Sequence, residues 1–216
     1  MEKLTVLSDF DGVICDTEAQ YTEFWGSMGV RYLGIDNLGQ LVKGQTLTQI
    51  LEHYFDGRED MRDAIVPALN EFEEKMTFEY IPGAHGFLTD LKAAGIPTAI
   101  VTSSDRNKMA HVYRAFPELT SLVDAILVSE DFKASKPDPD CFIKGMERLG
   151  GKPEDTVVFE DSFHGITAGR AAGAHVIGLA TTNPREAIAP MCDMVIDNFQ
   201  GLDIDTLLKS LNNVKR

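Results

Sequence analysis

The stretch TVLSDFDGVICDTE, residues 5–18, is the part of the sequence that decides the fold. An apolar run is followed directly by acidic side chains at positions 9, 11, 16 and 18. Such a run is typical of a buried β-strand, and a strand inside a core does not carry unpaired charges. We therefore expect the carboxylates of Asp9 and Asp11 to do chemistry at the tip of a strand.

The composition limits the partners of this protein. Its 216 residues suffice for one domain, or for a domain with a smaller insert. Acidic residues outnumber basic ones by 34 to 20, and the formal net charge is −14. Because nucleic acids and anionic membranes are bound by basic surfaces, we expect neither as a partner. A small anionic substrate fits this charge only where a metal ion or a lysine reverses the local field.

The cysteines and the N-terminal segment indicate a reducing compartment. The three cysteines, Cys15, Cys141 and Cys192, are widely spaced and resemble neither a disulfide framework nor a metal-binding pair. No secretory signal is visible, and no apolar stretch approaches the roughly 18 residues of a membrane span. We expect a cytoplasmic protein that is a monomer or a weak homodimer.

Short apolar runs recur along the chain and predict a parallel sheet. The expected strands are residues 4–7, 98–101, 125–128, 156–159, 175–179 and 194–196. Helical patterns such as residues 83–95 and 163–173 lie between them, and both end in glycine, as helices often do. This alternation predicts an α/β fold, a doubly wound parallel sheet with a Rossmann-like core.

Residues 17–79 interrupt the alternation. Their apolar residues recur at helical spacing without strand-like alternation. We therefore predict a small α-helical cap inserted after the first strand. The predicted core then consists of residues 1–16 and 80–216.

Polar side chains follow the expected strands at the points where the strands end. These residues are Asp9, Asp11, Ser103, Ser104, Lys136, Glu160 and Asp161. Ligands of open parallel α/β sheets bind at the carboxyl ends of the strands. We therefore expect this set to meet at one end of the sheet.

The chemistry of this set favours phosphoryl transfer. Carboxylates on two strands can hold Mg²⁺, and the candidate ligands are Asp9, Asp11, Glu160 and Asp161. One aspartate can attack phosphorus while the other protonates the leaving oxygen. Ser103 and Lys136 can bind the remaining phosphate oxygens, and such positioning and charge neutralisation are the main needs of the reaction.

Each residue also has a purely structural explanation. Asp11 with Gly12 is a common turn pair, and Ser103 is a common turn residue. Lys136 could be a solvated lysine of a loop, and Asp161 could cap the following helix. These explanations are independent of one another, so they do not account for all four groups at successive strand ends.

Four ordered stretches resemble the motifs of the haloacid dehalogenase superfamily. They are DFDGVICDT at 9–17, VTSS at 101–104, SKPDPD at 135–140 and VFEDS at 158–162. The stretch AGRAAGAHVIGL at 168–179 is also typical of the superfamily. Residues 17–79 resemble the small helical cap of its β-phosphoglucomutase-like branch.

The resemblance implies a role for each site residue. Asp9 would be the nucleophile and Asp11 the general acid and base. Asp161 and Glu160 would hold Mg²⁺ together with the Asp9 carboxylate and the Asp11 backbone carbonyl. Thr17 would lie at the hinge of the cap, and Lys43 and Gly44 would belong to a cap loop over the site. The implied substrate-binding residues are Thr17, Tyr21, Lys43, Gly44, Ser103, Ser104 and Lys136.

The resemblance also narrows the activity. Dehalogenases and phosphonatases of the superfamily lack the second aspartate of the first motif, which is Asp11 here, so neither activity is expected. We predict a Mg²⁺-dependent phosphatase that hydrolyses a small phosphorylated metabolite, a sugar phosphate, through an aspartyl-phosphate. The alternatives are a β-phosphoglucomutase-type mutase and a sensor of phosphorylated metabolites without turnover. Tyr21 is either a contact to the leaving group or an aromatic residue packed inside the cap.

Two departures from the mutase pattern predict net hydrolysis. Where the resemblance expects a cap histidine and a cap arginine, this chain has Tyr21 and Leu47. Leu47 offers no donor to a second phosphate, and Tyr21, with an unperturbed pKa of about 10, is a poor proton relay at neutral pH. With β-glucose 1-phosphate and a trace of the 1,6-bisphosphate, we expect net release of free phosphate. Glucose 6-phosphate forming much faster than free phosphate would favour the mutase instead.

Overall fold

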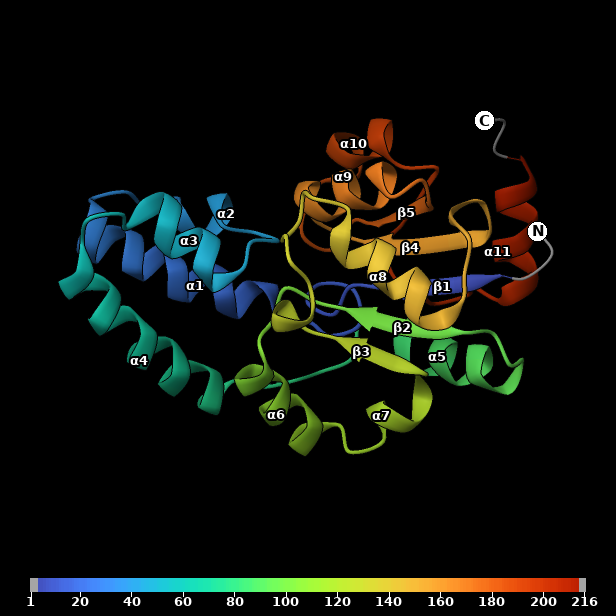
Figure 1. Ribbon diagram of the computed structural model, residues 1–216, viewed down its shortest axis with the longest axis horizontal. Helices are drawn as coiled ribbons and strands as arrows, with labels where there is room; N and C mark the ends of the chain where they lie inside the picture. The colour runs from blue at the N-terminus through green and yellow to red at the C-terminus, as the bar shows by residue number, and fades with distance from the viewer. Residues whose placement is uncertain (1–3, 214–216) are drawn as a thin grey trace.

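A six-stranded sheet forms the centre of the protein, whose structure, a computed structural model, describes residues 4–213. Every neighbouring pair of strands is parallel, and the order is β3-β2-β1-β4-β5-β6 (Figure 1). The strands are β1 (Thr5–Ser8), β2 (Thr98–Val101), β3 (Ala125–Leu127), β4 (Thr156–Glu160), β5 (His175–Leu179) and β6 (Met194–Ile196). Residues 1–3 and 214–216, the ends of the predicted core, lie outside the described part of the chain.

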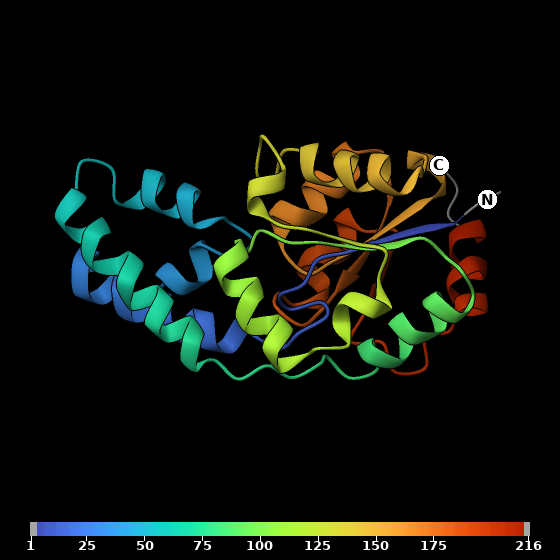
Figure 2. The same ribbon diagram turned by 60° about the horizontal axis from the view of Figure 1, so that its bottom comes forward.

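Helices cover both faces of the sheet because its side chains alternate between two apolar layers. Val6 belongs to the layer built with α5, α6 and α11, whereas Leu7 belongs to the layer built with α8, α9 and α10 (Figure 2). The helices are α5 (Ala84–Ala93), α6 (Arg106–Ala115), α7 (Leu119–Leu122), α8 (Asp140–Leu149), α9 (Phe163–Ala171), α10 (Arg185–Ile188) and α11 (Ile204–Asn213). Short 3₁₀ turns occur at Ser129–Asp131, Pro153–Asp155 and Ala189–Met191. This arrangement confirms the predicted doubly wound parallel sheet.

The predicted element limits agree closely with the structure. Each predicted strand begins and ends within one residue of the observed strand. The helical segments predicted at 83–95 and 163–173 contain α5 and α9, and each helix is followed by a glycine with positive φ, Gly95 or Gly173. Within residues 4–213, none of the helices combines the length and the apolar character needed to cross a membrane.

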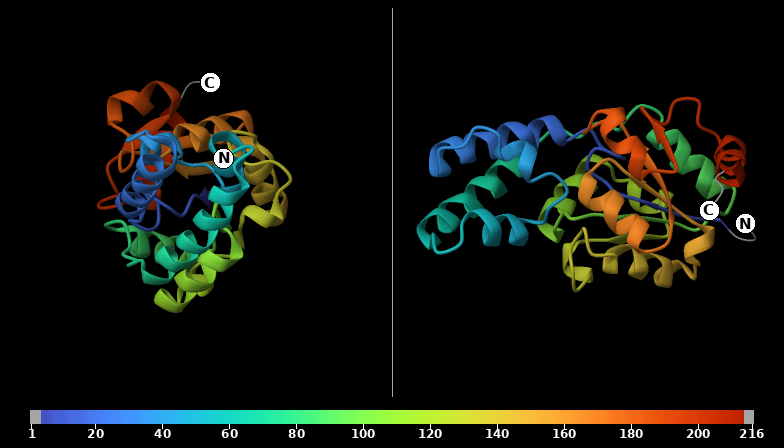
Figure 3. Two further views of the ribbon diagram at one scale, coloured as in Figure 1. Left: turned by 90° about the vertical axis from the view of Figure 1, so that its left-hand side faces the viewer. Right: turned by 90° about the horizontal axis from the view of Figure 1, so that it is seen from above.

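The segment between β1 and α5 is largely helical and has its own apolar cluster. It contains α1 (Glu18–Met28), a π-helical turn (Gly29–Leu33), α2 (Leu38–Leu41), α3 (Leu47–Tyr54) and α4 (Glu59–Lys75). Phe24 stacks on Phe72 with ring centroids 4.7 Å apart, and Phe55 and Ile65 are fully buried beside them. The segment projects from one end of the sheet (Figure 3). It therefore has the helical character predicted for residues 17–79, and we call it the insert.

The strand order places a crevice at one end of β1. From β1 the chain continues to β2 and β3 on one side, and from β3 it crosses to β4 on the other side, so the strand order reverses beside β1. A crevice of this kind is where open α/β sheets bind ligands. Asp9 follows β1, and the loops after β2, β3 and β4 meet it there.

Candidate active site

A buried lysine lies at the centre of the carboxyl end of the sheet. Lys136 is fully buried, and its ammonium lies 2.8 Å from Asp9 Oδ1 and 2.6 Å from Glu160 Oε1. It also donates to the Val101 carbonyl oxygen over 3.3 Å. Burial lowers the pKa of Lys136, but the charges of Asp9 and Glu160 outweigh burial, so the pKa is raised. The structure therefore places Lys136 between two acidic residues and not in solvent.

Glu160 links Lys136 to the loop after β4. Its Oε1 accepts from Lys136, and its Oε2 accepts from the backbone N–H groups of Asp161 and Ser162, each over 2.9 Å. The Ser162 hydroxyl also donates to Oε2 over 3.0 Å. A Cβ on Gly165 would lie 1.6 Å from Glu160 Oε1, so only glycine leaves room for this carboxylate. Both oxygens of Glu160 are thus engaged within the protein.

Three carboxylates come together beside Lys136. Oxygen atoms of Asp9, Glu160 and Asp161 all lie within 4.8 Å of one another. Burial raises the pKa of Asp9 to about 7, against the opposing charge of Lys136. Burial and the nearby Glu160 raise the pKa of Asp161 well above its ordinary value. One ammonium, that of Lys136, faces these three carboxylates and lies 2.8 Å from Asp9 Oδ1, so the acidic groups outnumber the cation beside them.

The loop after β5 orients Asp161. The Thr182 hydroxyl donates to Asp161 Oδ2, and the Asn183 amide donates to the Asp161 carbonyl oxygen over 2.9 Å. Gly12 passes close by with φ +72°, and a Cβ there would lie 2.0 Å from Asp161 Oδ2. The Asp11-Gly12 turn therefore exists, but its glycine is needed for the approach of Asp161.

Asp11 has a different environment from Asp9. Its Oδ1 accepts from the Thr17 hydroxyl and the Lys108 ammonium, and its Oδ2 accepts from the Ser104 hydroxyl over 2.9 Å. Burial alone would raise the pKa of Asp11. The charge and hydrogen bond of Lys108, with the two hydroxyls, outweigh burial and lower it. The pKa values of the two aspartates of one loop are thus shifted in opposite directions, which is typical of groups with separate catalytic roles.

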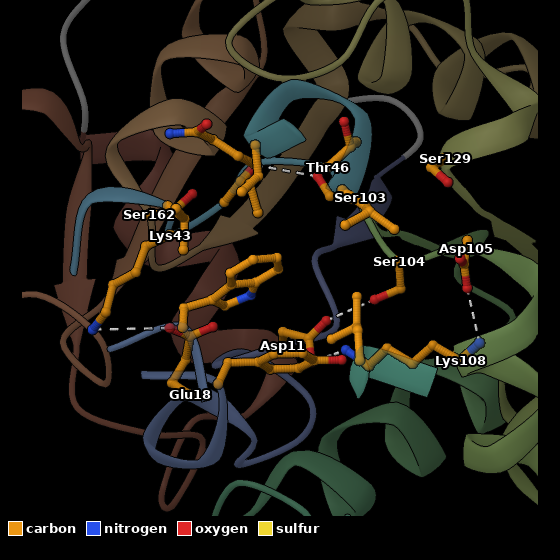
Figure 4. A pocket seen from close by; sticks show the side chains of 18 of the residues that line it. Asp11, Glu18, Lys43, Thr46, Ser103, Ser104, Asp105, Lys108, Ser129 and Ser162 are labelled. Atoms are coloured by element: carbon orange, nitrogen blue, oxygen red, sulfur yellow. Dashed lines mark hydrogen bonds and ion pairs between the residues drawn. The ribbon is translucent and has the colours of Figure 1, made fainter. Parts of the chain in front are cut away.

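A cavity of about 320 Å³ separates these residues from the insert. Its lining includes Asp9, Asp11, Asp161, Ser103 and Ser104 from the core, together with Glu18, Tyr21, Lys43, Gly44 and Glu73 from the insert. Figure 4 shows Asp11, Ser104 and Lys108 on one side of the cavity and Lys43 with Glu18 on another. A cavity that combines converging polar groups with shifted pKa values is the usual form of an active site.

The insert reaches the core through the loop that follows α2. The Ser103 hydroxyl donates to the Gly44 carbonyl oxygen over 3.3 Å, and Lys43 donates to the Thr182 carbonyl oxygen over 3.3 Å. A Cβ on Gly44, which has φ +75°, would lie 2.5 Å from Ser162 Oγ. These contacts bring Lys43, Gly44 and Ser103 together at the cavity.

Tyr21 is neither free nor packed only among apolar residues. Its hydroxyl donates to Glu73 Oε1 over 2.8 Å, and the Lys108 ammonium lies 4.5 Å from the centre of its ring. Burial, with the nearby Asp11, raises its pKa well above the ordinary value. Tyr21 is therefore a protonated donor at neutral pH.

Four residues of the site are absent from the sequence-based prediction: Lys108, Glu73, Thr182 and Asn183. Lys108 lies on the buried face of α6 with Met109 and Val112, and a lysine within an apolar face is a signal that the sequence carries. Thr182 and Asn183 follow β5, the position that identified the other site residues. Glu73 has no such signal, because α4 carries many acidic residues.

Comparison with known proteins agrees with this geometry. The model of the family described as haloacid dehalogenase-like hydrolase matches residues 6–179. Hexitol phosphatase A of Escherichia coli (strain K12) is 32% identical over 179 residues, which cover 80% of this chain and 81% of that protein. A β-phosphoglucomutase of Mycobacterium bovis is 28% identical and covers 91% of this chain and 90% of its own. A solved haloacid dehalogenase hydrolase, family IA, variant 3, of Entamoeba histolytica superimposes with a TM-score of 0.83 at 25% identity, covering 97% of this chain and 100% of that chain.

The close approach of Gly165 to the Glu160 carboxylate leads to a prediction about stability. In Gly165→Ala the new methyl group overlaps the Glu160 carboxylate, which must move away from Lys136. We expect the free energy of unfolding, measured in urea, to fall by about 1–3 kcal/mol or more. The matched control is Gly86→Ala, because Gly86 is also helical and a Cβ there meets nothing within 4 Å. The control should be neutral or stabilising by up to about 1 kcal/mol; equal effects of the two substitutions would contradict the packing argument.

Proposed function

The chain belongs to the haloacid dehalogenase-like hydrolase family, and from this membership we propose that it is a Mg²⁺-dependent phosphatase of a small phosphorylated metabolite, a sugar phosphate. The observation that carries the proposal is the division of Asp9 and Asp11 between two environments. Asp9 lies with Lys136 and the acidic group, whereas Asp11 lies with three donors at the cavity wall. Two carboxylates with opposed pKa shifts suit a nucleophile and an acid–base group.

We assign the nucleophile to Asp9. In the first step an Asp9 oxygen bonds to phosphorus, the bond from phosphorus to the leaving oxygen breaks, and that oxygen takes a proton. In the second step water attacks the same phosphorus, and the bond to Asp9 breaks to release phosphate. Lys136 supports this role because its charge favours the ionised, attacking form of Asp9. Ser103, at the cavity wall, would bind an oxygen of the transferred phosphoryl group.

We assign proton transfer to Asp11. Its ionised form, which the three donors favour, suits the base that takes a proton from the attacking water. The first step requires the protonated form, which the Lys108 charge disfavours. Asp11 lies outside the compact acidic group and lines the cavity, where the leaving group would bind.

The acidic residues fit a magnesium ion. Three buried carboxylates lie around the single ammonium of Lys136, and the raised pKa values of Asp9 and Asp161 indicate that their negative charge is not fully offset. The donor set is oxygen, which Mg²⁺ prefers. Asp9 and Asp161 would hold the ion together with the Asp11 backbone carbonyl, and Glu160, whose oxygens accept four hydrogen bonds, would act mainly by its charge. When bound, the ion would offset the charge of an incoming phosphate dianion.

We propose that residues 17–79 act as a cap that excludes water from the site. Gln49 of α3 donates to the Lys136 carbonyl oxygen over 2.8 Å, and Asn107 of α6 donates to Asn70 of α4 over 3.2 Å. Thr17 would be the hinge, since it precedes α1 and donates to Asp11. Closure of this kind strengthens electrostatic interactions at the reacting atoms.

The mutase is the second candidate because β-phosphoglucomutases are among the relatives. Leu47 lines the cavity and offers no donor, and the Tyr21 hydroxyl is engaged by Glu73. Neither residue supplies the phosphate-binding charge that a bisphosphate intermediate needs, so these residues favour hydrolysis.

Removal of the metal and of the nucleophile tests the proposal. With p-nitrophenyl phosphate, we expect phosphate release in Mg²⁺, loss of release in EDTA and recovery when Mg²⁺ is restored. Asp9→Asn should lower kcat by at least about 10³-fold, because the uncatalysed reaction is extremely slow. Asp161→Ala should raise the Mg²⁺ concentration needed for half-maximal rate.

The matched control is Asp16→Asn. Asp16 is an exposed carboxylate of the same loop and has no role in the proposed site. It should keep wild-type kcat and the wild-type Mg²⁺ requirement. Full activity in EDTA would contradict the metal assignment, and an Asp9→Asn protein with a tenth of wild-type kcat would contradict the nucleophile.

A further inference from the structure

The half of the cavity that faces the insert differs from the half that faces the acidic group. Its lining from the insert includes five apolar side chains, Trp25, Val42, Leu47, Ile50 and Leu69, beside polar ones such as Gln45, Thr46 and Thr48. Tyr21 and Glu73 are set into this surface. A wall that combines apolar side chains with converging polar groups fixes the orientation of a bound organic group. This half is therefore the place for the leaving group, the part of the substrate that is not phosphate.

Glu73 is the polar group of this wall that is best placed to bind a ligand. The residue is 6% exposed, and its Oε1 accepts from Tyr21. Within residues 4–213, the hydrogen bond from Tyr21 to Oε1 is the one that this carboxylate accepts, and Oε2 accepts none. Burial raises the pKa of Glu73, with the charge of Lys108 opposing the rise. A carboxylate buried to this extent has one oxygen left to accept a hydrogen bond from a ligand.

The charges around the leaving-group space are unfavourable for a second anion. The two lysines that line the cavity are both paired with carboxylates, Lys43 with Glu18 at 3.9 Å and Lys108 with Asp11. No arginine occurs among the lining residues of the described chain. The remaining charged residues on the wall and rim are acidic, namely Glu73, Asp105 and Glu130. A negatively charged leaving group would therefore find no lysine or arginine in the cavity lining that is not already paired with a carboxylate.

We infer that the enzyme selects phosphate monoesters whose leaving group is an uncharged polyol, and that Glu73 determines this selectivity. The inference rests on the proposed phosphatase function and deepens it. A hydroxyl of the leaving group donates to Glu73 Oε2, while Tyr21 holds Oε1 and fixes the carboxylate. A carboxylate or phosphate at the same position offers no proton to Glu73 and is repelled by it. Selection thus depends on the absence of charge at the end of the substrate remote from the scissile bond.

Two substrates that differ only at this end test the inference. Glucitol 6-phosphate and gluconate 6-phosphate have the same length, and a hydroxymethyl group in the first replaces a carboxylate in the second. For the wild type we expect kcat/KM to favour glucitol 6-phosphate by on the order of 100-fold, since two unscreened charges at close range interact strongly. In Glu73→Gln this ratio should fall by about tenfold or more, mainly through KM.

A second variant separates the charge of Glu73 from its position. Tyr21→Phe keeps the ring and the Glu73 charge and removes only the hydroxyl, so the ratio should stay high. Glu74→Gln is the matched control, because Glu74 is the exposed neighbour of Glu73 on α4. This control should leave the ratio unchanged.

The outcomes distinguish the inference from the function on which it rests. A wild-type protein that hydrolyses p-nitrophenyl phosphate but turns over both hexose-derived substrates equally would overturn the inference alone. An unchanged ratio in Glu73→Gln would overturn it too, as would a fall in Tyr21→Phe equal to that in Glu73→Gln. A wild-type protein that hydrolyses none of the three phosphate esters in Mg²⁺ would instead contradict the phosphatase function.

Discussion

The ion pairs of Lys136 with Asp9 and Glu160 are the interaction on which the rest of the site depends. A fully buried ammonium is tolerated only because two carboxylates and a carbonyl oxygen surround it. Removing one partner of such a group is costly, since an unmatched charge is left inside the protein. The loops after β1, β3 and β4 are therefore held in one arrangement by the same lysine. Glu160 extends this constraint to the next loop, because its second oxygen accepts from Asp161 and Ser162.

The sequence predicted the sheet well because its strands are apolar runs in a covered parallel sheet. It also identified the strand-end residues, because a parallel sheet brings the carboxyl ends of its strands to one edge. It did not identify the partners of those residues. Pairing of Lys108 with Asp11 depends on how α6 packs against the loop after β1, and Glu73 meets Tyr21 only when α4 and α1 are packed together. Such contacts join residues that are far apart in the chain and have no local pattern.

The site divides its tasks between the core and the insert. The core supplies the acidic group, Lys136 and Asp11, to which we assign the proposed phosphoryl transfer. The insert supplies apolar side chains and one buried carboxylate, Glu73, to which we assign the selection of the leaving group. Lys108 connects the two parts, since it pairs with Asp11 and lies over the ring of Tyr21.

The central claim is that Asp9, held by Lys136, becomes phosphorylated during turnover. The most direct measurement is to quench the reacting enzyme in acid, reduce the acyl-phosphate with borohydride and map the product by peptide mass spectrometry. Reduction converts a phosphorylated aspartate to homoserine and leaves an ordinary carboxylate unchanged. The account predicts homoserine at position 9, dependent on both substrate and Mg²⁺. Homoserine at position 11 or 161, or continued phosphate release with no reduced residue at position 9, would contradict it.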